Sequence, residues 1–292
     1  EVWYSDGSVI LQAESTYFRV HMSILAQHSS VFRDMFALGK ADCELVVEGC
    51  PIVFLSDTAQ DLEFYLKALY NPFPDQKPKQ FIEVAALLRL GRKYGIDQLR
   101  DDALARITYE FPHTLEKWDS RQIGSRIALN RSTYVDCINL CRELGLFSPL
   151  PTALYGWMHY LHDSKRLQEI FTGIARPDHT IAALSSGDQR LSVTALEKLL
   201  TTQWAAFAWL SADVDGCTEP QRCATFRTKM KDRLCIPSPK LSGMRKSHAP
   251  NTFTRGLCDK CATYANDGYE WGRQEIWANL PTNFGLPPWE EL

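Results

Sequence analysis

The sequence predicts an α+β protein, with a small sheet wrapped by short helices followed by a mostly helical C-terminal region. Strand patterns with a period of two are confined to residues 8–56. Apolar residues at helical spacing, opened by capping residues, begin at residue 23 and recur along the rest of the chain. The length of 292 residues suits about two domains, each with its own core.

Two strand hairpins are expected near the N-terminus. The stretch "SVILQA" (residues 8–13) is apolar and β-branched, and "TYFRVH" (16–21) alternates, with Phe18 and Val20 on one face. Only two residues separate these stretches, which favours a tight hairpin. The segment "CELVVEGCPIVFLS" predicts a second hairpin around Gly49.

Five short helices are expected around these strands. We expect Ser23 to cap the first helix and Ser29 to cap the second, which should end at Gly39. The apolar face of the second helix consists of Phe32, Met35 and Phe36. The third helix should follow Ser56 or Asp57 with a stripe of Leu62, Leu66 and Leu69; the fourth carries Phe81, Val84, Ala85 and Leu88; and Asp97 should cap the fifth.

Beyond residue 113 the strand signal fades. Helical periodicity is clear in "RSTYVDCINLCRELGL", "LPTALYGWMHYLHD", "SVTALEKLLTTQWAAFAWLSA" and "CATYANDGYEWGRQEIWANL". Residues 217–257 lack this pattern and are expected to be irregular. The predicted segments are residues 1–112 with the sheet, a helical region at 113–215, and a cysteine-containing basic segment with a C-terminal helix at 216–292.

The composition excludes several classes of protein. Its 45% hydrophobic and 23% charged residues are typical of globular proteins, and the net charge of −3 argues against a general attraction to nucleic acid or anionic membranes. No apolar run reaches the roughly 20 residues of a membrane span. The nine cysteines, an odd number spread unevenly, predict a reduced intracellular protein in the cytoplasm or the nucleus.

The order of the N-terminal elements, together with several motifs, resembles the BTB/POZ domain. "YLKALY" (residues 65–70) and "LLRLGRKYGIDQL" (87–99) match later helices of that family. The other matching residues, which include an F-x-V-H motif, are Phe18, Val20, His21, Leu25, Ser29, Val31, Phe32, Met35 and Phe36. With "CINLCRELGL", "LPTALYGW" and "LPTNFGLPPW", the whole chain is similar to the BTB proteins expanded in mushroom-forming fungi.

The resemblance implies a BTB/POZ domain at residues 1–112 and a function in protein–protein interaction rather than catalysis. It implies self-association, usually as a homodimer, or a scaffold role, and it offers a further role as substrate adaptor of a cullin ubiquitin ligase. The expected partners are proteins, a second copy of the chain or a cullin among them, without membrane, nucleic acid or cofactor. The residues assigned to the fold and dimer surface are Phe18, Val20, His21, Leu25, Phe32, Met35 and Phe36.

One position departs from the family pattern. Most members have Arg or Lys after the histidine of the motif, and this residue helps to form a charged pocket with an early aspartate. Here that position is Met22, and Asp6 is the candidate aspartate. Because methionine cannot make the charged pair, the departure argues against a pocket that recruits a corepressor. It also leaves the oligomeric state open.

Four cysteines near the C-terminus are candidate metal ligands. Cys258 and Cys261 have the C-x2-C spacing that lets two thiolates reach one zinc ion, and Cys217 and Cys223 are candidates for the second pair. The five residues between Cys217 and Cys223 are more than a zinc knuckle usually has. The spacing therefore leaves zinc, free thiols and a redox pair open. The spare candidates are Cys235 and His248.

The same segment is basic, which raises an alternative function as a DNA-associated transcriptional regulator using residues 217–261. Its charges are scattered and few aromatic residues lie among them, so a solvated surface is the other interpretation. The basic residues are Arg222, Arg227, Lys229, Lys231, Arg233, Lys240, Arg245, Lys246, Arg255 and Lys260.

A third hypothesis is a metal-dependent enzyme built on histidines and cysteines. His159 and His162 share a helix face, and Cys137 and Cys141 are one helical turn apart. Two ligands on one helix do not complete a metal site, so both pairs are interpreted as structural. The sequence has no G-x-S-x-G, P-loop or H-E-x-x-H motif, and we predict that the protein is not an enzyme.

Overall fold

The computed structural model describes residues 2–38, 46–71, 77–236, 239–245 and 254–292. The chain forms two compact units: unit 1 contains residues 1–110 and 122–129, and unit 2 contains residues 111–121 and 130–292. The predictions for Gly39, Lys246 and His248 lie outside the described residues.

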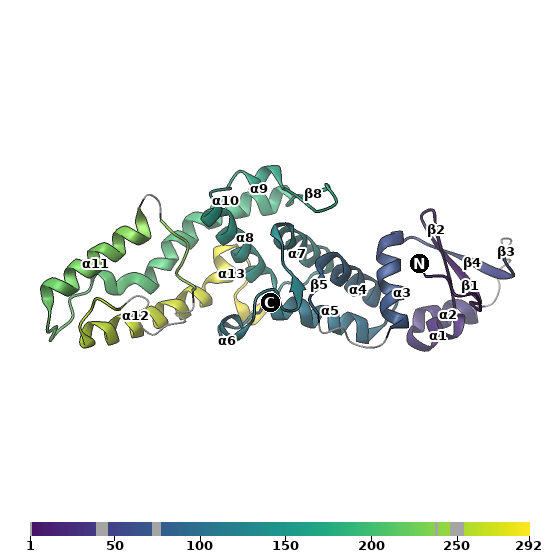
Figure 1. Ribbon diagram of the computed structural model, residues 1–292, viewed down its shortest axis with the longest axis horizontal. Coiled ribbons are helices and arrows are strands. Elements are labelled where there is room, and N and C mark those ends of the chain that lie inside the picture. The colour runs from purple at the N-terminus through teal and green to yellow at the C-terminus, as the bar shows by residue number, and fades with distance from the viewer. Residues whose placement is uncertain (1, 39–45, 72–76, 237–238, 246–253) are drawn as a thin grey trace. The chain divides into compact units, whose positions relative to one another are not determined.

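Unit 1 contains the four-stranded sheet (Figure 1). Its strand order is β2-β1-β4-β3, with β1 antiparallel to β2 and parallel to β4. The strands are β1 (Val9–Ala13), β2 (Thr16–Val20), β3 (Val46–Val47) and β4 (Cys50–Leu55). In β2, Phe18 and Val20 are buried and Tyr17 is exposed, which confirms the predicted alternation.

The two hairpins close through tight turns. Glu14, in the β1–β2 turn, has a φ of 52°. Glu48 and Gly49 join β3 to β4 and both have positive φ angles, of 49° and 75°, as the two-residue hairpin turns matching the strand twist require. The predicted second hairpin around Gly49 is therefore confirmed over its described residues.

Five helices accompany the sheet among the described residues of unit 1, as predicted. They are α1 (Met22–His28), α2 (Ser30–Ala37), α3 (Ala59–Tyr70), α4 (Phe81–Lys93) and α5 (Asp97–Glu110). The predicted stripes on α3 and α4 are buried, with Leu62 and Leu66 completely inaccessible. The core also contains Val9, Leu11, Leu25, Phe32, Tyr65 and Tyr94.

Among the predicted caps of α1, α2 and α3, one is confirmed and two are wrong. Ser29 caps α2 by accepting a hydrogen bond from the Phe32 amide, at 3.0 Å, as expected. Ser23 does not cap α1, because the backbone already becomes helical at Met22. Thr58, rather than Ser56 or Asp57, caps α3 by accepting from the amide of residue 61.

The segment 122–129 returns to unit 1 and adds strand β6 (Ile127–Ala128), parallel to β5 (Lys79–Gln80). The buried Glu110 carboxylate holds this segment by accepting hydrogen bonds from the backbone amides of Gly124 and Arg126, each at 2.9 Å. Such pairing supplies buried backbone donors with the partners they require. Short strands therefore persist beyond residue 113, where the sequence predicted none.

Unit 2 is mostly helical, which confirms the predicted fold class. Its elements are α6 (Leu115–Ser120), α7 (Arg131–Leu144), α8 (Leu150–Ser164), α9 (Glu169–Thr172), β7 (Ile174–Ala175), β8 (Ile181–Ala182), α10 (Ser186–Thr202), the 3-10 helix η1 (Gln203–Ser211), α11 (Pro220–Cys235), α12 (Asp259–Ala278), α13 (Leu280–Asn283) and the 3-10 helix η2 (Trp289–Glu291). The prediction of an irregular segment after residue 217 is wrong, because α11 occupies much of it. A division at residue 215 stays a prediction.

Helix α12 packs closely on η1 through a glycine. A Cβ atom on Gly272 would lie 2.3 Å from both the Cα and the amide nitrogen of Ala206. Only a residue without a side chain allows the two backbones to approach this closely. On the same helix, the guanidinium of Arg273 is buried and pairs with the carboxylates of Asp119 and Glu270.

Candidate functional site

The motif residues that carry the family resemblance lie in unit 1. Phe18, Val20, Leu25 and Phe32 are buried in the core, where the Phe32 ring stacks on Tyr94 with centroids 4.5 Å apart. Met35 and Phe36 are partly buried and pack against the same core. The four buried residues build the fold, and a role of the motif in self-association stays a prediction.

His21 joins the end of β2 to the start of α1 and has polar contacts with Tyr70 and Asp6. Its backbone amide donates to the Tyr70 hydroxyl at 2.8 Å, and its Nδ1 lies 3.0 Å from the same hydroxyl. Its Nε2 lies 3.2 Å from an Asp6 carboxylate oxygen. These contacts hold the His21 ring as a structural junction between β2 and α3.

Asp6, the candidate aspartate of a charged interface pocket, is thus paired with His21 rather than with the residue that follows it, Met22. The hydrogen bond from His21 lowers the pKa of the Asp6 carboxyl. Met22 donates its backbone amide to the Ser8 hydroxyl, at 3.0 Å, and brings no charge to this place. The geometry supports the interpretation that the usual charged pair is absent at these residues.

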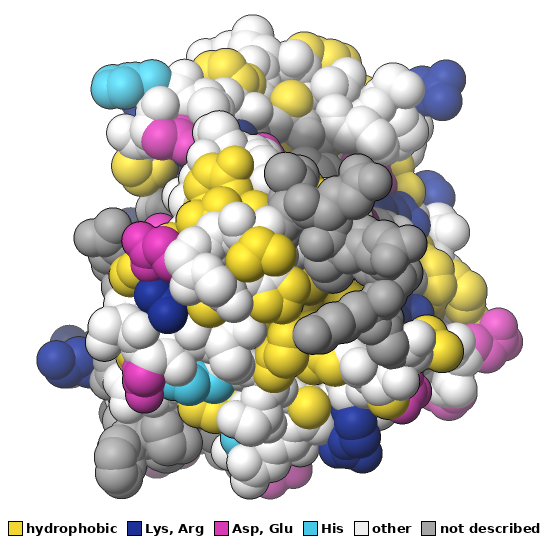
Figure 2. Space-filling view, turned by 90° about the vertical axis from the view of Figure 1, so that its right-hand side faces the viewer, with side chains coloured by type: hydrophobic (Ala, Val, Ile, Leu, Met, Phe, Trp, Pro, Cys, Tyr) yellow, Lys and Arg dark blue, Asp and Glu magenta, His cyan; other side chains and the backbone are white. Residues whose placement is uncertain are grey.

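Unit 1 also exposes apolar side chains on its sheet and on α2. Phe54 in β4 is 62% exposed, and Leu38 after α2 is 88% exposed. The others are Tyr17, Val31, Val46 and Val47. Figure 2 shows hydrophobic side chains gathered on the face of the molecule that it presents.

The outer face of the sheet carries apolar side chains of β4 beside Gln12 of β1 and Arg19 of β2. Cys50, Ile52 and Phe54 alternate along β4 and so share one face of the sheet. Ile10, Cys50 and Ile52 form a small buried cluster that is separate from the main core. The exposed Phe54 ring extends this row of apolar side chains at the end of β4.

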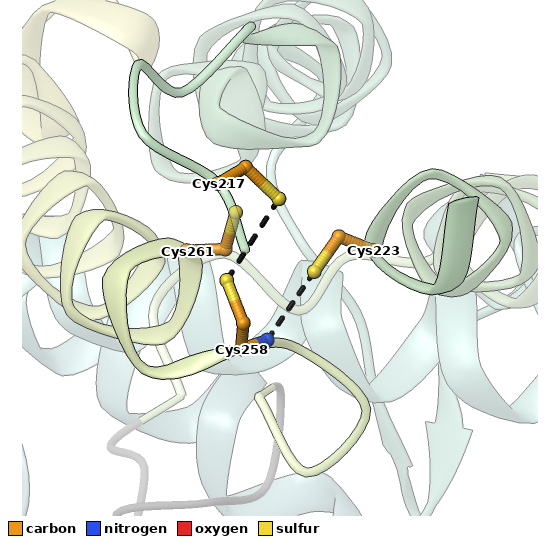
Figure 3. A group of neighbouring side chains, drawn as sticks. All are labelled: Cys217, Cys223, Cys258 and Cys261. Carbon is orange, nitrogen blue, oxygen red and sulfur yellow. Dashed lines mark hydrogen bonds between the residues drawn. The ribbon is translucent and has the colours of Figure 1, made fainter. Parts of the chain in front are cut away.

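In unit 2, the four candidate cysteines come together. The sulfur atoms of Cys217, Cys223, Cys258 and Cys261 all lie within 4.8 Å of one another (Figure 3). The Sγ atoms of Cys217 and Cys258 are 3.8 Å apart. Cys223, Cys258 and Cys261 are buried, and Cys217 is partly exposed. The sequence predicted this set as candidate metal ligands, and the fold places them at one point.

Two helix N-termini and a turn position these cysteines. Cys223 lies in the first turn of α11, and Cys217 precedes that helix in a loop that turns at Gly216, with a φ of 74°. Cys258 is the N-cap of α12, and Cys261 lies in the first turn of that helix. Five residues therefore separate the first pair because a loop and a helix start must fit between them.

Backbone amides donate to two of the sulfur atoms. The Cys258 amide donates to Cys223 Sγ at 3.2 Å. Amides of Cys261 and Thr218 donate to Cys258 Sγ and lower the pKa of that thiol to about 5. Burial raises the pKa values of the Cys223 and Cys261 thiols. Amide donors of this kind stabilise thiolates, the form of cysteine that binds metal.

A guanidinium connects the same two segments beside the sulfur atoms. Arg222, which precedes Cys223, donates from Nε to the Gly256 carbonyl and from Nη2 to the Leu257 carbonyl, each at 3.1 Å. A Cβ atom on Gly256 would lie 2.1 Å from the Phe226 ring. The segment that carries Cys258 is thus fixed against α11 by polar and close apolar contacts.

The other candidates from the sequence stay outside this cluster. His159 Nε2 lies 3.5 Å from an Asp163 carboxylate oxygen, and burial lowers the pKa of the His159 imidazole. Cys137 and Cys141 are completely buried, with their sulfur atoms 4.0 Å apart. Among the described residues, the four-cysteine set is the one group of three or more suitable ligands that converges on a point.

The basic residues do not form one face of α11. Arg227 and Lys231 lie on one side of the helix, while Lys229 and Arg233 lie on another, since each residue turns by about 100°. Arg222 is engaged with Glu219 and with backbone carbonyls. This arrangement gives the DNA-binding alternative no concentrated patch among the described residues of α11.

Sequence reasoning missed three residues that organise these sites. Tyr70 ends the "YLKALY" match, and its hydroxyl meets His21 from 49 residues away. Arg222 and Gly256 act through backbone contacts that no sequence spacing reveals. The available signal was that Arg222 directly precedes Cys223 and that Gly256 lies two residues before Cys258.

Comparison with known families identifies the N-terminal unit. Over the described residues, no helix is long and apolar enough to cross a membrane. A comparison with curated proteins found no match to this chain. Residues 4–108 match the family model of the BTB/POZ domain. The chain therefore carries a BTB/POZ domain at residues 4–108, a non-catalytic module through which proteins bind one another.

Proposed function

We propose that this protein is a scaffold that self-associates through its BTB/POZ domain and presents its helical unit 2 to a second protein. The observation that supports self-association is the exposure of two aromatic side chains, Phe54 and Tyr17, on the outer face of the sheet. Exposed Val46 and Val47 lie on the neighbouring edge strand β3. Large apolar side chains exposed near one another are typical of a protein-binding site. The proposed partner at this face is a second copy of the chain.

The test is the mass of the chain in solution, measured by sedimentation equilibrium over a range of concentrations. We expect a dimer for the wild type and a shift to monomer for Phe54→Asp, because a charge cannot be buried unpaired at the interface. Phe171→Asp in unit 2 is the matched control, since Phe171 is 63% exposed and Phe54 is 62% exposed. A wild-type monomer at every concentration, or an equal response of both variants, would contradict self-association through this face.

The finer proposal is that the scaffold works as a substrate adaptor of a cullin ligase. The BTB/POZ domain supports it, because proteins of that family include cullin adaptors. The experiment is a binding titration of the full chain with the N-terminal domain of a BTB-recruiting cullin. Binding with a micromolar or lower Kd would support the adaptor role. No binding at high concentration would exclude the adaptor role and leave the scaffold role as the proposed function.

Two further assignments accompany this proposal. The similarity of "CINLCRELGL" and "LPTALYGW" to BTB proteins of mushroom-forming fungi supports membership of that group. None of the described cysteines forms a disulfide, which supports a reducing compartment such as the cytoplasm or the nucleus. A regulator that binds DNA through residues 217–261 would instead show DNA affinity that falls steeply with salt.

A further inference from the structure

We propose that Cys217, Cys223, Cys258 and Cys261 bind one Zn²⁺ ion, which fastens the start of α11 to the start of α12. The proposal concerns the architecture of unit 2 and does not depend on how the BTB/POZ domain associates. It rests on the placement of the four sulfur atoms, on the donors around them, and on the small apolar surface of α11.

The distances fit a single tetrahedral ion. Sulfur ligands at about 2.3 Å from zinc lie about 3.8 Å from one another at the corners of a tetrahedron. The Sγ atoms of Cys217 and Cys258 are 3.8 Å apart, and no pair among the four exceeds 4.8 Å. Packing in an apolar core alone does not require four sulfur atoms to lie this close to one another.

The ligand set selects a structural site. Four thiolates from one chain complete the tetrahedral coordination of zinc and leave no position for water or substrate. Oxygen-preferring Mg²⁺ and Ca²⁺ do not suit four sulfur ligands. Three of the four cysteines are buried, which shields the metal from exchange with solvent. The proposed ion therefore supplies folding energy rather than catalysis.

The surroundings compensate the charge of the site. Four thiolates with one Zn²⁺ leave two negative charges. Cys223, Cys258 and Cys261 lie at helix N-termini, where the backbone dipoles favour anions. Amides donate to Cys223 Sγ and Cys258 Sγ, as outer-shell partners of metal ligands commonly do. The Lys260 ammonium lies beside Gly216, next to Cys217.

A bound metal would stabilise the position of helix α11, which has little buried apolar surface. Only Cys223, Met230 and Leu234 are buried among its 16 residues, and it carries many charged side chains. A helix with so little apolar burial gains little stability from packing. Met230 and Leu234 lie in the second half of α11, whereas Cys223 lies in its first turn, so a metal bound by Cys223 holds the other end of the helix.

A disulfide is a poorer account of the cluster. The 3.8 Å between Cys217 and Cys258 sulfur atoms far exceeds the roughly 2.05 Å of a sulfur–sulfur bond. A single disulfide would also leave the other two buried thiols without a role. The free-thiol alternative gives no reason for cysteines from two distant segments to surround one point.

The first experiment measures zinc and iron by mass spectrometry in the full chain, purified without chelator. We expect about one zinc ion per chain and little iron. Cys223→Ser and Cys258→Ser should each lose most of this zinc. Cys235→Ser is the matched control, because Cys235 lies on α11 and is outside the cluster, and it should keep the metal.

A second measurement on the wild type covers the case in which the cysteine variants fail to fold. Cobalt(II) replacing zinc should show the visible absorption of a tetrahedral thiolate site, and zinc should protect four thiols from alkylation until a chelator removes it. Removing the metal should speed proteolysis within α11. Stoichiometric iron, a disulfide among the four, or no zinc retained after reduction and addition of zinc sulfate would overturn the proposal.

Discussion

The contact between α12 and η1 predicts opposite effects for one substitution at two positions of the same helix. A Cβ on Gly272 would lie 2.3 Å from backbone atoms of Ala206, whereas carbon atoms in contact normally lie about 3.5–4.0 Å apart. The backbones would have to separate by more than about 1 Å, and overpacking of this kind costs about 1–3 kcal/mol. Because the clash is with backbone rather than with a flexible side chain, we expect the upper end.

Helix propensity acts in the other direction and gives the control. Gly→Ala inside a helix gains about 1 kcal/mol, so Gly272→Ala should lower the free energy of unfolding by about 2 kcal/mol. At Gly268 the added Cβ would meet its nearest atom, in Trp209, at 3.6 Å, an ordinary contact. Gly268→Ala should therefore stabilise unit 2 by about 0.5–1 kcal/mol.

Thermal unfolding followed by circular dichroism measures both variants. For a domain of this size, about 2 kcal/mol corresponds to a fall in Tm of about 4–8 °C for Gly272→Ala, while Gly268→Ala should raise Tm slightly. The reasoning is refuted if Gly272→Ala is as stable as the wild type, or if the two variants shift Tm in the same direction.

Three further variants test the cores and the buried polar contacts, each by urea unfolding. Phe32→Ala empties a completely buried position and should cost about 3–5 kcal/mol; a near-neutral result would mean that the ring is not in the core. Tyr70→Phe removes the hydroxyl that accepts a hydrogen bond from the His21 amide and should lower the free energy of unfolding by about 1–2 kcal/mol. An unchanged free energy of unfolding would mean that water replaces the hydroxyl. Arg273→Ala leaves the largely buried Asp119 carboxylate without its guanidinium and should cost about 3–5 kcal/mol, whereas Arg273→Met should cost less.

The N-terminal fold could be predicted from the sequence because its signals are local. Alternation at Phe18 and Val20 and the turn at Gly49 are each decided by a few neighbouring residues. The N-cap residues of the helices were harder to predict. Ser23, Ser56 and Thr58 offer similar side chains, and tertiary packing decides where the backbone becomes helical. Such shifts of one or two residues at helix ends are expected where several capping residues compete.

Helix α11 was missed because its pattern is weak. Its three buried residues are spaced by seven and four positions within a mostly charged and polar segment, so the apolar stripe is too thin to detect. The cysteines themselves were recognised, but their spacing fits no common class. The loop at Gly216 and the contacts of Arg222 bring the two pairs together, and neither follows from spacing.

The residues that identify the BTB/POZ domain and the residues that choose its partner are largely different sets. Phe18, Val20, Leu25 and Phe32 are buried, so selection for the fold alone accounts for them. A partner meets only exposed atoms, and here those include Phe54 on the outer face of the sheet. It follows that a partner cannot be inferred from the motif, and that substitutions at exposed positions are the informative ones. A change at Phe54 that alters association without altering the Tm would separate binding from folding in this domain.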